Sequence, residues 1–285
     1  MWCNTSVLID CGVDWFTTSS LDDPTSTLLC LKADSLLRQE ERKGFYVKPW
    51  RMAGYHGYRC GRVEMGMRSD GACVRLSSDL AASYWWDLYQ ITGRCSRIDV
   101  QATLRCEGPV NDEISAMNDM AHSFFAERQG GPKITWWGNS EGGSTLYLGA
   151  RQSSWYFRAY NKEAESGEDV WARCVRVELE IKNRMCESAI AYMLSQDTVQ
   201  VGLLSLLQDH MTNRGIVTKL TPAVPHSFYE CPRIVTDERQ SLSWLRSAVR
   251  PTVQRLLDRG LVHEVMDGLG LHYPPNENLD HPGSE

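Results

Sequence analysis

Residues 174–182, CVRVELEIK, alternate between apolar and polar side chains without interruption. A period of two residues is the period of a β-strand, whose successive side chains point to opposite faces of a sheet. The pattern predicts a strand with one face in a hydrophobic core and another that carries Arg176, Glu178, Glu180 and Lys182. Taken alone, this charged face is equally typical of a strand that faces water.

A second segment, residues 97–104 (RIDVQATL), repeats the alternation and places Arg97, Asp99, Gln101 and Thr103 on its polar face. Aspartate is disfavoured in the interior of strands, so Asp99 indicates a functional role over a solvated edge charge. Further strands are predicted at residues 6–9, 14–18, 59–67, 72–76, 145–148 and 156–161.

Helices are predicted to interrupt these strands at residues 79–92 and 111–128, the second with Asn111 as its N-cap. Helical periodicity then dominates, with one long or broken helix at 184–212 and another at 237–260 that Pro251 should kink. This order predicts an α+β fold with a central, mostly antiparallel sheet, flanking helices and a helical C-terminal segment. We divide the chain into a sheet domain at 1–183, a helical segment at 184–272 that packs on or extends it, and a disordered tail at 273–285.

Composition excludes several classes of protein. With 42% hydrophobic and 23% charged residues the chain is not disordered, and it lacks the apolar run of about 18 residues that a membrane span needs. The first residues have no basic, apolar leader, which predicts a cytoplasmic location and reduced cysteines. A net charge of -6 argues against coating nucleic acid by bulk electrostatics but leaves room for a local basic groove. No histidine pair has the spacing of a zinc site, so carboxylates are the expected ligands of any metal.

The segment with the most chemistry is residues 149–165, GARQSSWYFRAYNKEAE. If residues 156–162 are extended, Arg158 and Lys162 flank Tyr160 on one face and can stabilise a phenolate or the oxygens of a phosphate. An aromatic cross-strand pair among surface charges is the alternative. If the three segments pair, Asp99 and Glu178, with Glu180 as a third candidate, offer hard oxygen ligands to Mg²⁺ or Mn²⁺. The combination favours attack by Tyr160 on a phosphodiester whose other oxygens are held by Arg158, Lys162 and Lys182.

These residues resemble a known family. GARQSSWYFRAYNKEAE resembles the G-S-R-x-S and R-x-Y-x-K-x-x-E signature of the transfer-type replication initiators of rolling-circle plasmids, which are related to relaxases of phages and conjugative elements. The segments VDWFTTSS, SRIDVQATL, RVELEIK and SLSWLRSAVRPTVQRLLDRG resemble further motifs of that family, so the resemblance runs from about residue 13 to residue 270. Ala150 replaces the usual serine of the G-S-R turn, and Gln101 and Thr103 stand where members often have another acid, which leaves the third metal ligand open.

The resemblance implies a palm-like antiparallel sheet and makes residues 1–183 the catalytic domain of a metal-dependent DNA endonuclease and strand transferase. Such an enzyme nicks one strand at a replication or transfer origin, leaving a 5′-phosphotyrosine bond and a free 3′-hydroxyl for a polymerase. By position Tyr160 is the nucleophile, Arg158 and Lys162 are the catalytic cations, and Asp99, Glu178 and Glu180 hold Mg²⁺ or Mn²⁺.

Origin DNA is the implied partner, with host helicase, host polymerase and a second copy of the chain as further expectations. We predict DNA contacts at Arg151, Arg176, Lys182, Arg246, Arg250 and Arg255. Two alternatives stay open: a non-catalytic DNA-binding regulator of the same fold, and a metal-dependent nuclease that uses water while Tyr160 only stacks on a base.

Overall fold

The computed structural model describes residues 7–126, 128, 131–138, 142–217, 220 and 259–260. The chain divides into two compact units, Met1–Cys231 and Pro232–Glu285, and every described helix and strand belongs to the first. The helix predicted at 237–260 lies outside the described residues except for residues 259 and 260, and so do Pro251, Arg246, Arg250, Arg255 and the tail at 273–285.

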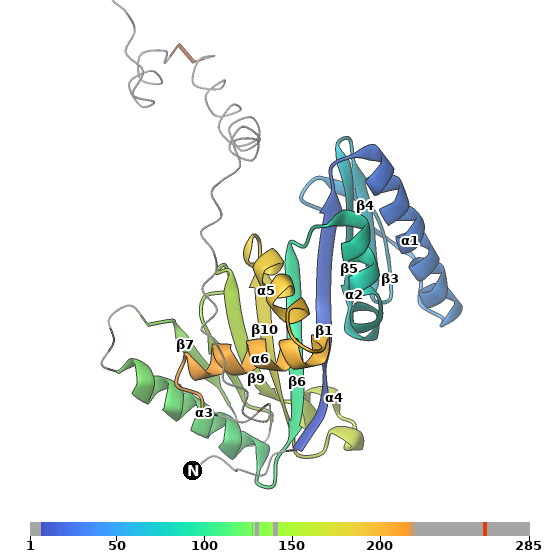
Figure 1. The fold of residues 1–285 in the computed structure, drawn as a ribbon. Coiled ribbons are helices and arrows are strands. Elements are labelled where there is room, and N and C mark those ends of the chain that lie inside the picture. The colour runs from blue at the N-terminus through green and yellow to red at the C-terminus, as the bar shows by residue number, and fades with distance from the viewer. Residues whose placement is uncertain are drawn as a thin grey trace, which may run out of the picture. The chain divides into compact units, whose positions relative to one another are not determined.

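A ten-stranded antiparallel sheet forms the centre of the first unit (Figure 1). The strands are β1 Val7–Ser20, β2 Lys48–Met52, β3 Tyr55–Cys60, β4 Val63–Arg68, β5 Gly71–Ser77, β6 Arg97–Arg105, β7 Ile134–Trp137, β8 Thr145–Leu148, β9 Trp155–Asn161 and β10 Cys174–Lys182. Their order in the sheet is β2-β3-β4-β5-β1-β6-β10-β9-β8-β7. The predicted α+β class with an antiparallel sheet is confirmed.

The helices are α1 Asp23–Arg42, α2 Ser78–Thr92, α3 Val110–Phe125, α4 Lys162–Ser166, α5 Met185–Leu194 and α6 Val199–Thr212, with a short 3₁₀ helix at Asp169–Trp171. α3, α5 and α6 lie over one face of the sheet in the half that holds β10 and β9 (Figure 1). None of the helices in the described ranges has the length and apolarity needed to cross a membrane.

The hydrophobic core lies between the sheet and the helices α1, α2, α3, α5 and α6. Neighbouring strands contribute fully buried side chains to it, among them Phe16 from β1, Ile98 from β6, Leu179 from β10, Phe157 from β9 and Leu146 from β8. An antiparallel sheet with one covered face leaves its other face to polar residues. The alternation in β6 and β10 therefore fixes which side chains remain available for chemistry.

Strand β1 differs from the prediction. The sequence predicts separate strands at 6–9 and 14–18, whereas the structure has one strand of 14 residues. Its register against β6 shifts between Leu8 and Asp10 and again between Val13 and Trp15. A bulge of this kind inserts an unpaired residue and re-aims its side chain. The second shift leaves Asp14 as the inserted residue.

Helix α1 and strands β2 and β7 are absent from the sequence prediction. The signals for α1 are nevertheless present. Asp22 caps the helix by accepting from the Thr25 amide at 3.0 Å, and a proline lies in the first turn. The apolar residues that α1 buries, Leu29, Ala33, Leu36 and Leu37, follow helical spacing.

Three predicted boundaries also change. The strand predicted at 59–67 divides into β3 and β4 around Gly61, whose φ of +53° suits a turn. The segment 184–212 is broken into α5 and α6. Pro109 occupies the N-cap position of α3, and Asn111 instead accepts from the Ser144 amide at 3.1 Å. Asn111 thereby joins the start of α3 to the segment that enters β8.

Candidate active site

The three segments with polar faces are neighbours in the sheet, because β10 lies between β6 and β9. Glu178 pairs with Arg158 on one side and Gln101 on the other, while Glu180 pairs with Tyr156 and Asp99. Residues paired in this way share a face. Tyr160, Glu178 and Asp99 therefore all lie on the face opposite the core, as the alternation predicts.

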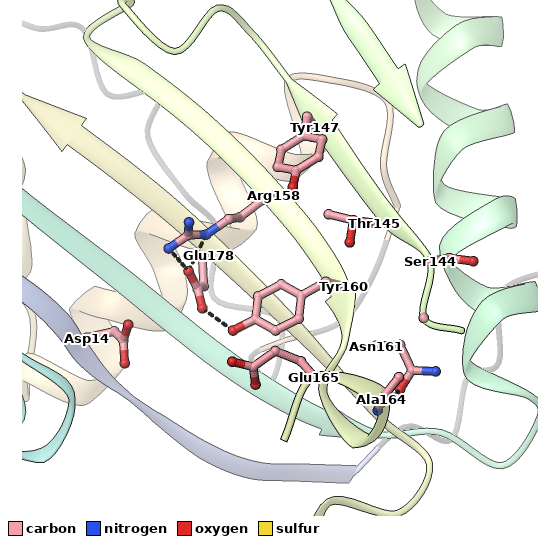
Figure 2. A pocket seen from close by; sticks show the side chains of 11 residues that line it. Asp14, Ser144, Thr145, Tyr147, Arg158, Tyr160, Asn161, Ala164, Glu165 and Glu178 are labelled. Atoms are coloured by element: carbon pink, nitrogen blue, oxygen red, sulfur yellow. Dashed lines mark hydrogen bonds and ion pairs between the residues drawn. The ribbon is translucent and has the colours of Figure 1, made fainter. Parts of the chain in front are cut away.

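An open cavity of about 470 Å³ lies on this face. It is lined by residues of β1, β8, β9 and β10, together with Gly143, Ser144, Ala164 and Glu165. Figure 2 shows the side chains of Tyr160 and Arg158 both directed at Glu178, with Asp14 on the opposite side of that carboxylate. The cavity thus combines a hydroxyl, a cation and carboxylates.

The hydroxyl of Tyr160 donates to Oε1 of Glu178 at 2.5 Å. Burial raises the pKa of Tyr160, and the charge of Glu178 together with this hydrogen bond raises it further. The phenol is therefore fully protonated near neutral pH, and the group that can accept its proton is already in contact with it.

Arg158 holds the other oxygen of Glu178 through both Nε and an Nη atom, and lies 3.7 Å from Asp99. Burial alone would lower the pKa of Arg158, but the charges of Glu178 and Asp99 outweigh it and raise that pKa. Arg158 is therefore a permanent cation beside the hydroxyl of Tyr160.

A second charged cluster, made of Arg97, Asp99 and Glu180, lies beside the first on β6 and β10. Arg97 donates to both oxygens of Asp99, at 2.8 and 2.6 Å, and contacts Glu180 at 2.9 Å. Its guanidinium also lies 4.7 Å from the ring centre of Trp15. Asp99 is only 1% exposed, and burial raises its pKa to about 6 against the opposing effect of Arg97. Asp99 and Glu180 are thus both paired with cations.

The three predicted metal ligands share a face but do not converge on one point. No group of three or more carboxylate, histidine or cysteine side chains in the described part of the chain is arranged to hold a metal ion. Glu178 and Asp14 are two carboxylates that line the same cavity. Burial and the charge of Glu178 raise the pKa of Asp14, so negative charge at this point lacks full compensation. Two carboxylates in that state are suitable donors for a hard divalent cation.

Asp14 is the functional candidate that sequence reasoning missed. The segment VDWFTTSS carries it, but an alternating strand gives no sign that Asp14 leaves the regular register. The bulge in β1 is the feature that turns it toward Glu178.

Lys162 occupies a different place from the one predicted. Strand β9 ends at Asn161, which caps α4 by accepting from the Ala164 amide at 3.0 Å. Lys162 is therefore the first residue of a helix, and its Nζ lies 2.5 Å from Glu165 and 5.9 Å from the ring centre of Trp171. It does not continue the row of β9 side chains beyond Tyr160.

Of the predicted DNA contacts that the structure describes, Arg176 and Lys182 are held by other protein groups, whereas Arg151 is exposed. Arg176 is only 8% exposed and donates to Thr103 at 2.8 Å, with Asp10 at 3.7 Å, so it supports the polar face from within. Lys182 donates to the backbone oxygen of Arg151 and pairs with Glu180. The Arg151 side chain is exposed. Contacts of Arg151, Arg176 and Lys182 with DNA stay predictions.

A comparison with protein-family models finds a match in the middle of the chain. Residues 115–218 match the family model described as replication initiation factor. The match confirms the resemblance found in the sequence, and the matched segment contains Tyr160 and Glu178 but not Asp14 or Asp99.

The chain is also similar to a solved structure described as a rolling circle replication initiator protein from Geobacillus stearothermophilus. The identity is 16% and the TM-score 0.44, over 81% of this chain and 90% of that chain. A search of curated proteins found no match.

Proposed function

We propose that this protein initiates replication or transfer by nicking one DNA strand at an origin, with Tyr160 as the nucleophile. The observation that carries the proposal is the hydrogen bond from Tyr160 to Glu178 in an open cavity on the polar face. Both residues lie in the segment that matches the replication initiation factor family. A nucleophile in contact with a base that is itself oriented by a third group is the usual arrangement for covalent catalysis, and Arg158 supplies the orientation here.

The chemical step follows from these positions. The Tyr160 oxygen forms a bond to phosphorus as the bond between phosphorus and the 3′-oxygen breaks. The phenolic proton passes to Glu178, and the departing oxygen takes a proton from water to become a 3′-hydroxyl. Because its raised pKa keeps Tyr160 protonated, proton transfer accompanies attack. The DNA stays attached as a 5′-phosphotyrosine, and the reverse reaction rejoins the strand.

Arg158 lines the cavity and is the cation best placed to bind a phosphate oxygen as charge develops on it. Lys162 supports the same role from the start of α4, where Glu165 now holds it. Entry of a phosphate would offer each cation a further anionic partner.

We further propose that Mg²⁺ or Mn²⁺ binds at this face. Mg²⁺ is commonly held by one or two carboxylates together with waters and substrate phosphates. Glu178 and Asp14 are the first ligands by this argument, and Asp99 and Glu180 are the further carboxylates of the same face. When bound, the ion would withdraw charge from the scissile phosphate. It would compete with Arg158 for the oxygens of Glu178.

The test is incubation with single-stranded origin DNA from the element that encodes the chain, followed by denaturing electrophoresis. We expect a covalent protein–DNA adduct and a fragment with a free 3′-hydroxyl. Cleavage without an adduct would identify a nuclease that uses water, and binding without cleavage a regulator. Host helicase, host polymerase and a homodimer stay predictions of the family resemblance, and a cytoplasmic location stays a prediction from the first residues of the sequence.

A further inference from the structure

On the polar face of the sheet, which carries Tyr160, Glu178 and Asp99, aromatic side chains continue beyond Tyr160 toward the edge of the sheet. Tyr160 pairs with Thr145 of β8, and Thr145 pairs with Trp137 of β7. The three residues therefore form a row across three strands on one face. Neighbouring strands lie about 4.8 Å apart, so Trp137 is about 10 Å from Tyr160 along the sheet.

Both tryptophans of β7 are exposed, Trp136 at 46%, and Trp137 is the one that shares a face with Tyr160. Trp137 is 67% exposed, the highest value among the tryptophans that the structure describes as exposed. Trp136 precedes it, points to the opposite face and pairs with the buried Leu146. Single exposed apolar residues are common on protein surfaces, but exposed apolar side chains that are grouped together mark a binding surface.

A second aromatic group borders the same cavity. Tyr147 pairs with Arg158 and lines the cavity, and its ring stacks on Tyr156 with centres 5.7 Å apart and an interplanar angle of 14°. Tyr156 pairs with Glu180, so both rings belong to the polar face. Aromatic surface is therefore present on β7, β8 and β9.

Two cations lie near this aromatic surface. Lys133 immediately precedes β7, and its backbone oxygen accepts from Gly149, which opens the turn that contains Arg151. Both side chains are exposed, and neither forms an ion pair within the described ranges. They are free to bind phosphate oxygens.

We propose that Trp137 and the stacked pair of Tyr147 and Tyr156 form a single-stranded DNA track that leads to Tyr160. Bases of single-stranded DNA would stack on these rings while Lys133 and Arg151 bind the backbone. This combination of aromatic faces and a cationic border is the usual way to hold a single strand without reading its sequence. A duplex does not fit the proposal, because its bases are already stacked on each other and paired. The inference rests on the proposed function, since it assigns the substrate strand to the cavity of Tyr160.

The test uses Tyr160→Phe protein, so that binding is measured without cleavage. The probe is a fluorescein-labelled oligothymidylate of roughly 12 nucleotides, within the range that a single-strand site covers. Adding Trp137→Ala should weaken binding by about 5- to 150-fold, which is the range for losing one stacked base. Adding Trp136→Ala is the matched control, because its ring lies on the other face of the same strand, and it should leave affinity unchanged. Thermal denaturation of each variant checks that it is folded.

Salt dependence separates stacking from charge and from a merely structural effect. Trp137→Ala should shift the whole plot of log affinity against log salt without changing its slope. Lys133→Ala and Arg151→Ala should each lower that slope by about 0.7. Binding by a folded Trp137→Ala variant within twofold of its parent overturns the track, and so does an equal loss in Trp136→Ala.

The same measurements distinguish this inference from the proposed function. If wild-type protein forms a DNA adduct but Trp137→Ala binds normally, the track is wrong and nicking stands. If Trp137→Ala loses single-strand binding but wild-type protein forms no adduct, the track stands and the nicking proposal is wrong.

Discussion

Tyr160 and Glu178 are 18 residues apart in the chain, yet their side-chain oxygens lie 2.5 Å apart across neighbouring strands. The register of β9 against β10 sets this contact, since Glu178 pairs directly with Arg158 and Arg176 with Tyr160. A register slip of one residue would send every side chain of β10 to the opposite face. The contact between Tyr160 and Glu178 therefore depends on correct sheet pairing as much as on the identity of the two residues.

The first prediction concerns the nucleophile. Tyr160→Phe removes only the hydroxyl, so it should abolish the covalent adduct while origin binding persists. Mass spectrometry of the DNA-linked peptide from wild-type protein provides the measurement. Tyr147→Phe is the control, because Tyr147 lines the same cavity but its ring stacks on Tyr156, whereas Tyr160 is the tyrosine that donates to Glu178. An adduct on Tyr147 or Tyr156 would refute the assignment.

The second prediction concerns the proton acceptor. Glu178→Gln keeps the shape of the side chain but removes its charge, and should lower the nicking rate about 10²- to 10⁴-fold. Glu180→Gln is matched to it, since both residues lie on the same face of β10 but Glu180 pairs with Arg97 and Lys182, whereas Tyr160 donates to Glu178. Single-turnover nicking of a labelled oligonucleotide compares them. Equal losses in the two variants would show that Glu178 contributes only its negative charge and does not accept the proton of Tyr160.

The third prediction concerns the metal. Chelation by EDTA should stop nicking, and Mg²⁺ or Mn²⁺ should restore it. Asp14→Asn should raise the Mg²⁺ concentration needed for half-maximal nicking by about tenfold or more. Asp10→Asn serves as the control, because Asp10 is also on β1 but is held by Gln101 at 2.8 Å. Undiminished nicking in EDTA would exclude the divalent cation.

The fourth prediction concerns pH. Burial raises the pKa of Asp99 to about 6, above the value of about 3.9 in an unfolded chain. A raised carboxyl pKa contributes stability that is complete below about pH 4 and is lost as pH rises through about 6, by up to about 3 kcal/mol. Asp99→Asn should therefore flatten the dependence of unfolding free energy on pH between 4 and 6.

Urea unfolding in EDTA measures this dependence without competition from metal. Asp34→Asn is the control, because it alters an exposed pair with Arg38 on α1. An unchanged slope in Asp99→Asn would mean that Asp99 does not titrate in that range.

The fifth prediction concerns packing beneath the sheet. Glycine to alanine within a helix ordinarily stabilises by about 1 kcal/mol. At Gly202 of α6, however, an added Cβ would lie 2.3 Å from the backbone oxygen of Met193 in α5. The clash should outweigh the gain, so Gly202→Ala should lower the midpoint of thermal unfolding. Gly12→Ala places its Cβ 3.8 Å from Ala82, an ordinary contact, and provides the comparison.

The alternation in residues 97–104 and 174–182 was sufficient to predict β6, β10 and the face on which Asp99, Glu178 and Glu180 lie. That succeeds because the two faces of each strand have different surroundings: one packs in the hydrophobic core and the other carries polar side chains that pair with one another, which imposes a strict period of two. The pattern could not show which ion pairs form across strands, since Arg97 and Arg158 reach residues whose distance depends on register.

The failures have local causes. Asp14 was missed because a bulge has no reliable signature in one sequence, and Lys162 was misplaced because Asn161 ends β9 as a helix cap. The edge strand β7 has only four residues, too few for a convincing period. By contrast, α1 could have been found from Asp22 and the spacing of its leucines.

The position of β10 has a consequence for biosynthesis. Tyr160 is made before Glu178, and β10 lies between β6 and β9 in the sheet. A nascent chain cannot complete the polar face until β10 has left the ribosome and inserted between those two strands. A prematurely terminated product that ends before residue 178 carries Tyr160 without the carboxylate to which its hydroxyl donates. On the proposed mechanism, therefore, a chain that ends before β10 cannot nick DNA.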